Sequence, residues 1–262
     1  RDIGVTGVQT CALPISHFLI SPGFIDTHLH LPQFDMIGAH GLPLLQWLSN
    51  VTFRAEARWE DPDFAAAMVS RAVSQCFSFG TTAICAYASV HHQATDAALR
   101  IARDAGMRGV IGQVLMDRQA PDSLCRSASQ LIGETATLLD GFPPGSPMAA
   151  AVTPRFAITC SEELLADAGR LAHETSAVVQ THLAETIPEC QRVSELFGGR
   201  SYVDVYDRAG LMGPRSLFGH GIHLNDVDRN RLAARRGMIA HCPTANSFLR
   251  SGTMHRHALV ND

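Results

Sequence analysis

The stretch Pro22-Gly23-Phe24-Ile25-Asp26-Thr27-His28-Leu29-His30 decides the fold and indicates the chemistry. An apolar run over residues 18–25 predicts a β-strand that ends just before two histidines placed two residues apart. Residues i and i+2 of an extended chain point to the same side, so His28 and His30 are expected to aim at one point. Two neutral imidazoles that converge at a strand end suit a zinc-like ion.

Two further histidines follow short apolar runs of strand character. His182 lies within residues 178–185, and His220 lies within residues 216–221. In a (β/α)8 barrel the loops after the strands build the site at one face, so histidines after separate strands can meet there. The sequence therefore predicts a metal site on an α/β barrel, and its candidate ligands are His28, His30, His182 and His220.

Strand-like and helix-like segments alternate along the chain, which favours a parallel sheet covered by helices. Seven strands are one fewer than a closed barrel needs, so we expect an incomplete (β/α)8 TIM-type barrel without its eighth strand. The expected strands are residues 18–26, 81–87, 108–116, 149–152, 178–181, 217–219 and 238–240. The expected helices are residues 42–52, 62–79, 95–105, 123–139, 161–173, 188–197, 202–209 and 226–235.

The composition excludes several other classes of protein. A length of 262 residues allows one large core, and a net charge of -4 leaves no basic surface for nucleic acid. No apolar stretch reaches the ~18 residues of a membrane span. The seven cysteines are scattered without a Cys-x-x-Cys pair, which predicts a reduced, cytoplasmic protein.

Both ends of the chain differ from an ordinary domain. Residues 1–16 resemble the in-frame translation of a sequencing adapter, and we expect them to be a non-native leader. The barrel domain is then expected over residues 17–262. No turn or cap closes the chain at Asp262. We therefore expect an internal piece of a longer gene.

The motif Asp26-Thr27-His28-Leu29-His30 resembles the signature of the amidohydrolase superfamily, and the run from His241 to Asn246 is similar to its strand-seven motif. The resemblance covers residues 18–252. It implies that the four histidines bind metal together with an Asp after strand eight, and that a small β-sandwich flanks the barrel; both are missing here. The chain contains no lysine. It therefore cannot supply the carboxylated lysine of binuclear members, which implies a single zinc ion.

Within the superfamily, three features are similar to the guanine deaminases. Gln33 follows the histidine pair by three residues, Thr153-Pro154-Arg155-Phe156 ends the fourth expected strand, and residues 44–53 contain Leu-Leu-x-Trp-Leu followed by Thr-Phe. The resemblance implies zinc-dependent hydrolysis of guanine to xanthine and ammonia, and a homodimer at full length. Gln33, Arg155 and Phe156 would hold the purine, and Glu185, three residues after His182, would carry the proton.

Alternatives stay open at this point. Another mononuclear amidohydrolase would act on adenosine, S-adenosylhomocysteine, cytosine or a triazine. A protein that binds zinc without turnover is a second alternative. His241 lies either near the site or only at the end of the last strand. The zinc class of cytidine deaminases is excluded, because the chain has no Pro-Cys-x-x-Cys motif.

Overall fold

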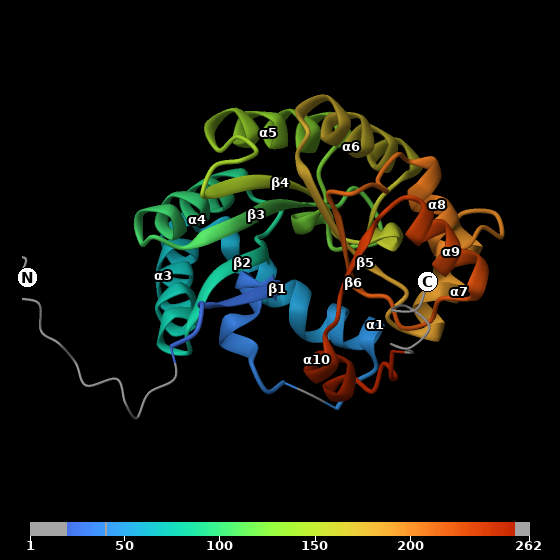
Figure 1. Cartoon of the computed structure of the whole chain (residues 1–262), viewed down its shortest axis with the longest axis horizontal. Helices are drawn as coiled ribbons and strands as arrows, with labels where there is room; N and C mark the ends of the chain where they lie inside the picture. The colour runs from blue at the N-terminus through green and yellow to red at the C-terminus, as the bar shows by residue number, and fades with distance from the viewer. Residues whose placement is uncertain (1–19, 40, 255–262) are drawn as a thin grey trace, which may run out of the picture.

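The structure, a computed structural model, describes residues 20–39 and 41–254. Within them, seven strands form one sheet in which every strand lies parallel to its neighbours in sequence. Figure 1 shows the sheet curling into a barrel with helices around its outside. The predicted incomplete barrel is confirmed. Its strands are β1 (Phe24–His30), β2 (Thr81–Tyr87), β3 (Arg108–Leu115), β4 (Met148–Pro154), β5 (Val178–Leu183), β6 (Ser216–His220) and β7 (Met238–Ala240).

The first strand differs from its prediction. We expected residues 18–26, but β1 begins at Phe24 and continues through both histidines to His30. The reason lies in pairing: β2 begins at Thr81, which pairs with Phe24, and the last pair joins His30 to Tyr87. Residues 20–23 have no regular structure, and residues 18 and 19 lie outside the described part. His30 therefore lies in the paired part of β1, whereas His28 lies in the irregular stretch between the pairs of Asp26 and Leu29.

The longest helix shows why the alternation could be read from the sequence. Helix α3 (Pro62–Ser78) begins at Asp61, whose carboxylate accepts hydrogen bonds from the backbone N–H groups of Asp63 and Phe64. Pro62 occupies the first turn, where its missing N–H has no cost. The buried positions are spaced by three and four residues, as one face of a helix requires. They are Ala65, Met68, Val69, Ala72 and Val73.

Other helices match their predictions with shifted ends. Helix α5 begins at Ala128 instead of residue 123, because Ser127 caps it through the N–H of Gln130 and residues Asp122–Leu124 form a separate 3-10 turn. A short helix after β7 was not predicted. The other α-helices after α3 are α4 (His92–Asp104), α6 (Glu162–Thr175), α7 (Ile187–Leu196), α8 (Tyr202–Arg208), α9 (Asp226–Ala234) and α10 (Pro243–Phe248).

The segment from Leu44 to Glu60, between β1 and α3, forms a helix of changing pitch. It consists of α1 (Leu44–Trp47), a π-helical turn (Leu48–Thr52), α2 (Phe53–Ala57) and a 3-10 turn (Arg58–Glu60). The prediction covered only residues 42–52. Changes of this kind inside a helix often accompany functional sites. Here α2 carries two buried side chains, Phe53 and Glu56, whose contacts are described below.

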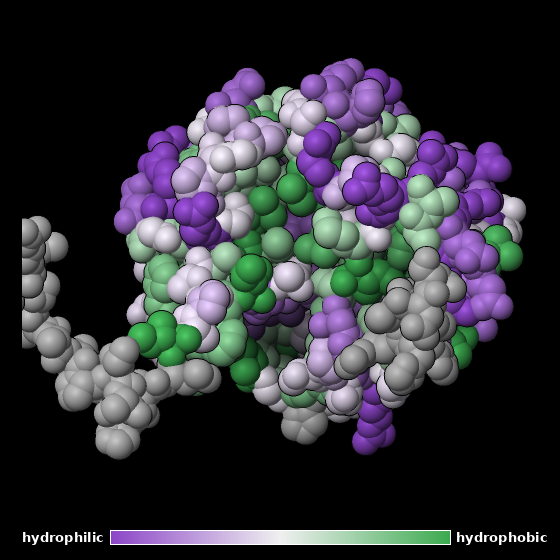
Figure 2. Space-filling view, viewed as in Figure 1, coloured by the Kyte–Doolittle hydropathy of each residue, from purple (hydrophilic) through white to green (hydrophobic). Residues whose placement is uncertain are grey.

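The core lies inside the barrel and between the barrel and its helices. Figure 2 shows hydrophobic side chains near the centre of the viewed face and hydrophilic ones over the outer helices. Inside the barrel, the Gln180 amide nitrogen donates to the carbonyl of Ala86 and to the hydroxyl of Thr153, which ties three strands together. Among the described residues, no helix is both long and apolar enough to cross a bilayer. The predicted leader lies outside the described residues.

Candidate metal and ligand site

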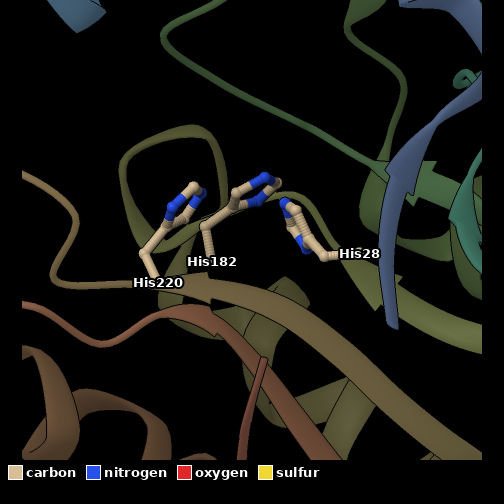
Figure 3. A group of neighbouring side chains, drawn as sticks. All are labelled: His28, His182 and His220. Atoms are coloured by element: carbon tan, nitrogen blue, oxygen red, sulfur yellow. The ribbon is translucent and has the colours of Figure 1, made fainter. Parts of the chain in front are cut away.

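Three histidines from three strands meet at one end of the barrel. His28 lies on β1, His182 on β5, and His220 is the last residue of β6. One ring nitrogen of each lies within 4.8 Å of those of the other two. Figure 3 shows the three rings turned toward one another. Zinc–nitrogen bonds of about 2.0–2.1 Å place two ligand nitrogens at most about 4.2 Å apart, so a slight approach of the three rings would let them share one cation.

Hydrogen bonds fix two of these rings. The Nδ1 atom of His182 lies 2.5 Å from the backbone carbonyl of Arg155, and Nδ1 of His220 lies 2.8 Å from Oδ1 of Asn246. Both partners are oxygen acceptors, so each Nδ1 donates and each Nε2 keeps its lone pair. Acceptors behind ligand histidines are a usual feature of metal sites, because they fix the tautomer and the ring orientation.

The electrostatics of the cluster favour neutral rings. Burial lowers the pKa of His28, His30, His182 and His220 below the ordinary value for histidine. Neighbouring histidines and the positive charge of Arg155 lower the pKa of the first three further. A neutral imidazole is the form that binds a metal ion. The cluster is therefore ready for a cation at neutral pH.

The backbone around the cluster shows why the sequence needs small or strained residues there. His220 and Ala184 have φ angles of 72° and 46°, in the left-handed region that side chains seldom adopt. Gly219 lies against His28: a Cβ atom at this glycine would lie 2.6 Å from Cε1 of the His28 ring. Only glycine allows that ring to lie where it does.

The fourth predicted ligand, His30, lies beside the cluster. Its Nε2 atom is 2.9 Å from Nε2 of His182, and its ring stacks on Tyr87 with centroids 4.4 Å apart. Nδ1 of His30 is buried and has no hydrogen-bond partner within residues 20–39 and 41–254. Among the described residues, the mutually close group contains the other three histidines and not His30. Three of the four predicted ligands thus form one compact set.

A cavity of about 290 Å³ opens onto the histidines. All eight residues predicted for the site line it, although they come from widely separated parts of the chain. Gln33 lies in the 3-10 turn Leu31–Met36, and Phe156 follows β4 and is 4% exposed. The remaining wall is mostly apolar, with Leu29, Phe34, Met36, Leu44, Trp47 and Leu48 among its residues. An apolar pocket with a few convergent polar groups is typical of a small-molecule site.

Glu185 follows β5, lines the cavity and lies beside the histidine cluster. One of its carboxylate oxygens is 3.3 Å from Nε2 of His220, and the other accepts a hydrogen bond of 2.8 Å from the hydroxyl of Ser251. Burial raises the pKa of Glu185 to about 7, which the bond from Ser251 opposes. A carboxyl group with this pKa can both accept and release a proton near neutrality.

A second buried carboxyl group supports Glu185 and was not predicted. Glu189 accepts hydrogen bonds from the backbone N–H groups of Glu185 and Thr186 and from the hydroxyl of Tyr202. Burial raises its pKa to about 7, and the nearby Glu185 adds to the effect. The sequence did contain a signal, because Thr186 and Glu189 have the spacing of a helix capping box, which the structure shows at the start of α7.

Arg155 also has a partner that the sequence analysis missed. Its Nη1 atom lies 2.5 and 2.6 Å from the two carboxylate oxygens of Glu56. The ring of Phe53 lies 5.4 Å from the guanidinium carbon. The only sequence signal was that Glu56 stands three residues after Phe53, which places both on one face of a helix.

His241 was left open and does not join the cluster. It is exposed, whereas Asn246 from the same motif is buried and contacts His220. His241 is therefore the residue after β7, and the motif reaches the site through its asparagine.

Comparison with known proteins is consistent with this geometry. The sequence profile of the amidohydrolase family matches residues 19–262. The chain therefore belongs to the amidohydrolase family.

Within this family, the chain is similar to several guanine deaminases. Guanine deaminase of Escherichia coli is 40% identical over 236 residues, which cover 89% of this chain and 54% of that protein. The structure of the E. coli enzyme matches with a TM-score of 0.88 at 39% identity, over 90% of this chain and 55% of that one. A guanine deaminase from C. acetobutylicum with guanine bound in its active site matches with a TM-score of 0.87 at 31% identity, over 92% of this chain and 58% of that one. The chain thus spans about half the length of these relatives.

Proposed function

We propose that the protein containing this chain hydrolyses guanine to xanthine and ammonia and uses one zinc ion. The observation that carries the proposal is the cavity that joins the histidine cluster to Arg155, Phe156 and Gln33. Relatives named guanine deaminase, at 36–40% identity over about nine-tenths of this chain, support the choice of substrate.

The donor set fits a zinc ion. His28, His182 and His220 would hold it, and His30 lies close enough to complete the set, with its Nε2 beside that of His182. Neutral imidazoles are common zinc ligands, and burial favours the neutral form of all four rings. A bound zinc ion would supply Lewis acidity, which lowers the pKa of water at the site.

Glu185 would transfer the proton. Hydrolysis adds water at C2 of guanine and breaks the bond between C2 and the exocyclic nitrogen, so the leaving amine must gain a proton. The carboxylate of Glu185 lies next to His220 and is held from behind by Ser251. It would accept a proton from the attacking water and pass it to the amine, a step that a group with a pKa of about 7 performs well.

The purine would be held by three residues of the same cavity. Arg155 offers a planar donor for acceptor atoms of the base, Phe156 offers a ring face, and Gln33 offers both a donor and an acceptor. The apolar wall suits the faces of a neutral aromatic base. Discrimination would come from buried polar groups, which a wrong base leaves unpaired.

The proposal is tested with a panel of substrates, by ammonia release from the amines and by chloride release from the triazine. The full-length gene product is loaded with zinc and offered guanine, adenosine, S-adenosylhomocysteine, cytosine and a chlorinated triazine. We expect ammonia from guanine at least about 10²-fold faster than from the other amines, since buried hydrogen bonds reject mismatched bases strongly. Turnover of another substrate in preference to guanine would contradict the substrate, and bound zinc without any turnover would contradict the enzyme.

We also propose that the full-length protein is a homodimer in the cytoplasm. Residues 1–16 would not belong to the native protein, and the barrel domain would occupy residues 17–262. The free thiols of the six cysteines in the described residues support a reducing compartment. Sequencing the source locus across both ends tests the leader. Size-exclusion chromatography of the full-length product tests the dimer.

A further inference from the structure

The ion pair between Glu56 and Arg155 is almost fully shielded from water. The side chain of Arg155 is 2% exposed and that of Glu56 is 0% exposed. These residues are 99 positions apart in the chain, and they lie on α2 and directly after β4. A buried pair of charges is costly to assemble and adds little to stability compared with apolar residues of the same volume. Its presence beside the cavity therefore points to a role other than stability.

The geometry leaves part of the guanidinium available to a ligand. Both contacts with Glu56 use the same nitrogen, Nη1. Among the residues that the structure describes, Nε and Nη2 of Arg155 have no hydrogen-bond partner, and Arg155 lines the cavity. Phe53 lies 5.4 Å from the guanidinium carbon, on the same helix as Glu56. Two side chains of α2 thus fix the plane and the direction of the guanidinium.

The net charge of the pair, like the direction of the guanidinium, determines which ligand Arg155 can bind. An arginine alone in an apolar cavity would attract anions. The carboxylate of Glu56 offsets that charge within hydrogen-bond distance. The remaining donors then suit a neutral ligand that presents acceptor atoms in the plane of its ring.

We propose that Glu56 is a positioning residue for substrate specificity: it holds Arg155 so that the free guanidinium donors meet the oxygen-bearing edge of a neutral 6-oxopurine. This inference rests on the proposed function, since it takes a purine as the ligand. It adds a residue from α2, in the helical segment between β1 and α3, to the set that selects the base.

A purely structural role makes a different prediction. If the pair only fastened α2 to the barrel, losing it would weaken every substrate to the same degree. If the pair aims the donors at the 6-oxo group, losing it would weaken substrates that carry this oxygen more than substrates that lack it. The comparison of guanine with 2-aminopurine separates the two, because 2-aminopurine lacks the 6-oxo group.

The experiment compares Glu56→Gln with the unchanged full-length protein, both loaded with zinc. We expect the ratio of kcat/KM for guanine over 2-aminopurine to fall about tenfold, the size of one charge-assisted hydrogen bond, mainly through KM for guanine. Zinc content should stay unchanged. A matched control is Glu134→Gln on α5, which removes a carboxylate paired with Gln113 and Gln130 away from the cavity and should leave the ratio unchanged.

The outcomes distinguish this inference from the proposed function. An equal loss for both purines in Glu56→Gln would overturn the inference while guanine turnover by the unchanged protein still supports the function. No ammonia from guanine with the unchanged protein would overturn both.

Should Glu56→Gln fail to fold, two further variants serve. In an Arg155→Met background, Glu56→Gln removes no remaining charge pair and should leave the purine ratio where Arg155→Met sets it. Glu56→Asp keeps the charge but shortens the arm, and it should lower the ratio below that of the unchanged protein while zinc content stays the same. A further fall of the ratio in the double variant would contradict the inference.

Discussion

The Nδ1 atom of His182 lies 2.5 Å from the backbone carbonyl of Arg155, so one residue contacts both halves of the site. The carbonyl of Arg155 fixes a ring of the metal cluster, while its side chain lines the cavity and pairs with Glu56. The two functions use different atoms of one residue. They can therefore be separated by substitution, because a change of side chain leaves the carbonyl in place.

Arg155→Ala should keep zinc and lose selectivity for guanine. The carbonyl that orients His182 remains, whereas the guanidinium donors disappear. The change leaves Glu56 buried without its partner, which should destabilise the fold by about 3–5 kcal/mol. Zinc content by mass spectrometry, thermal unfolding and the substrate panel together check this. A loss of zinc in proportion to activity in folded protein would contradict the separation.

Asn246→Ala should weaken metal binding although Asn246 does not lie among the metal-binding residues themselves. Its Oδ1 atom is the acceptor for Nδ1 of His220, so its loss frees the ring to rotate and to change tautomer. We expect zinc affinity to fall by about 10–100-fold, as for other residues behind ligand histidines. Competition with a chelator measures this. Asn230→Ala is the matched control, because Asn230 is an exposed residue of α9. Equal zinc affinities in the two variants would refute the role of Asn246.

Gly219→Ala should also reduce zinc affinity, through His28. The added Cβ would lie 2.6 Å from Cε1 of the His28 ring, which must then move away from the cluster. We expect at least about tenfold weaker zinc binding with the secondary structure retained. Gly133→Ala on α5 is the control, because nothing lies within 4 Å of a Cβ there. Native affinity in Gly219→Ala would show that the ring position is not critical.

Glu185→Gln should retain zinc and lose turnover. The amide keeps the shape of the side chain but cannot accept and release a proton, so kcat should fall about 10²–10⁴-fold. An unchanged kcat would exclude Glu185 as the proton carrier.

The pH dependence of the rate tests the role of Glu185 independently. Burial raises the pKa of Glu185 to about 7, and the carboxylate form is the one that accepts the first proton. The rate should therefore rise with pH up to a midpoint no higher than about 7, since a bound cation favours the carboxylate and shifts the midpoint down. The residual activity of Glu185→Gln should lack this rise, and a profile shared by both proteins would assign the titration to another group.

Local signals explain why much of the fold could be predicted. The Asp61-Pro62 start of α3 and the strands β2 and β7 follow from caps, glycines and apolar runs within a few residues of each element. The start of β1 was wrong, because the pairing with β2 decides it and apolar character does not. Strand ends depend on a partner that is distant in sequence, and no local pattern reports it.

The residues of the site also divide into those that local motifs identify and those that only the folded chain brings together. The four candidate ligand histidines and the Thr-Pro-Arg-Phe run stand in motifs that can be read locally. These histidines line the cavity, as do Arg155 and Phe156 from the run. Glu56, Asn246 and Ser251 contact Arg155, His220 and Glu185 across 99, 26 and 66 residues of chain. Partners of this kind come together only through the folded barrel. Sequence reasoning therefore finds the groups that perform the chemistry more readily than those that hold them.

The most direct test of the account is zinc titration of the metal-free, full-length protein with guanine as substrate. Xanthine and ammonia are measured in equal amounts against bound zinc. We expect activity to rise linearly and to level at one zinc ion per chain, and His182→Ala should abolish both binding and activity. Full zinc occupancy without xanthine, or guanine hydrolysis that is independent of zinc, would contradict the account.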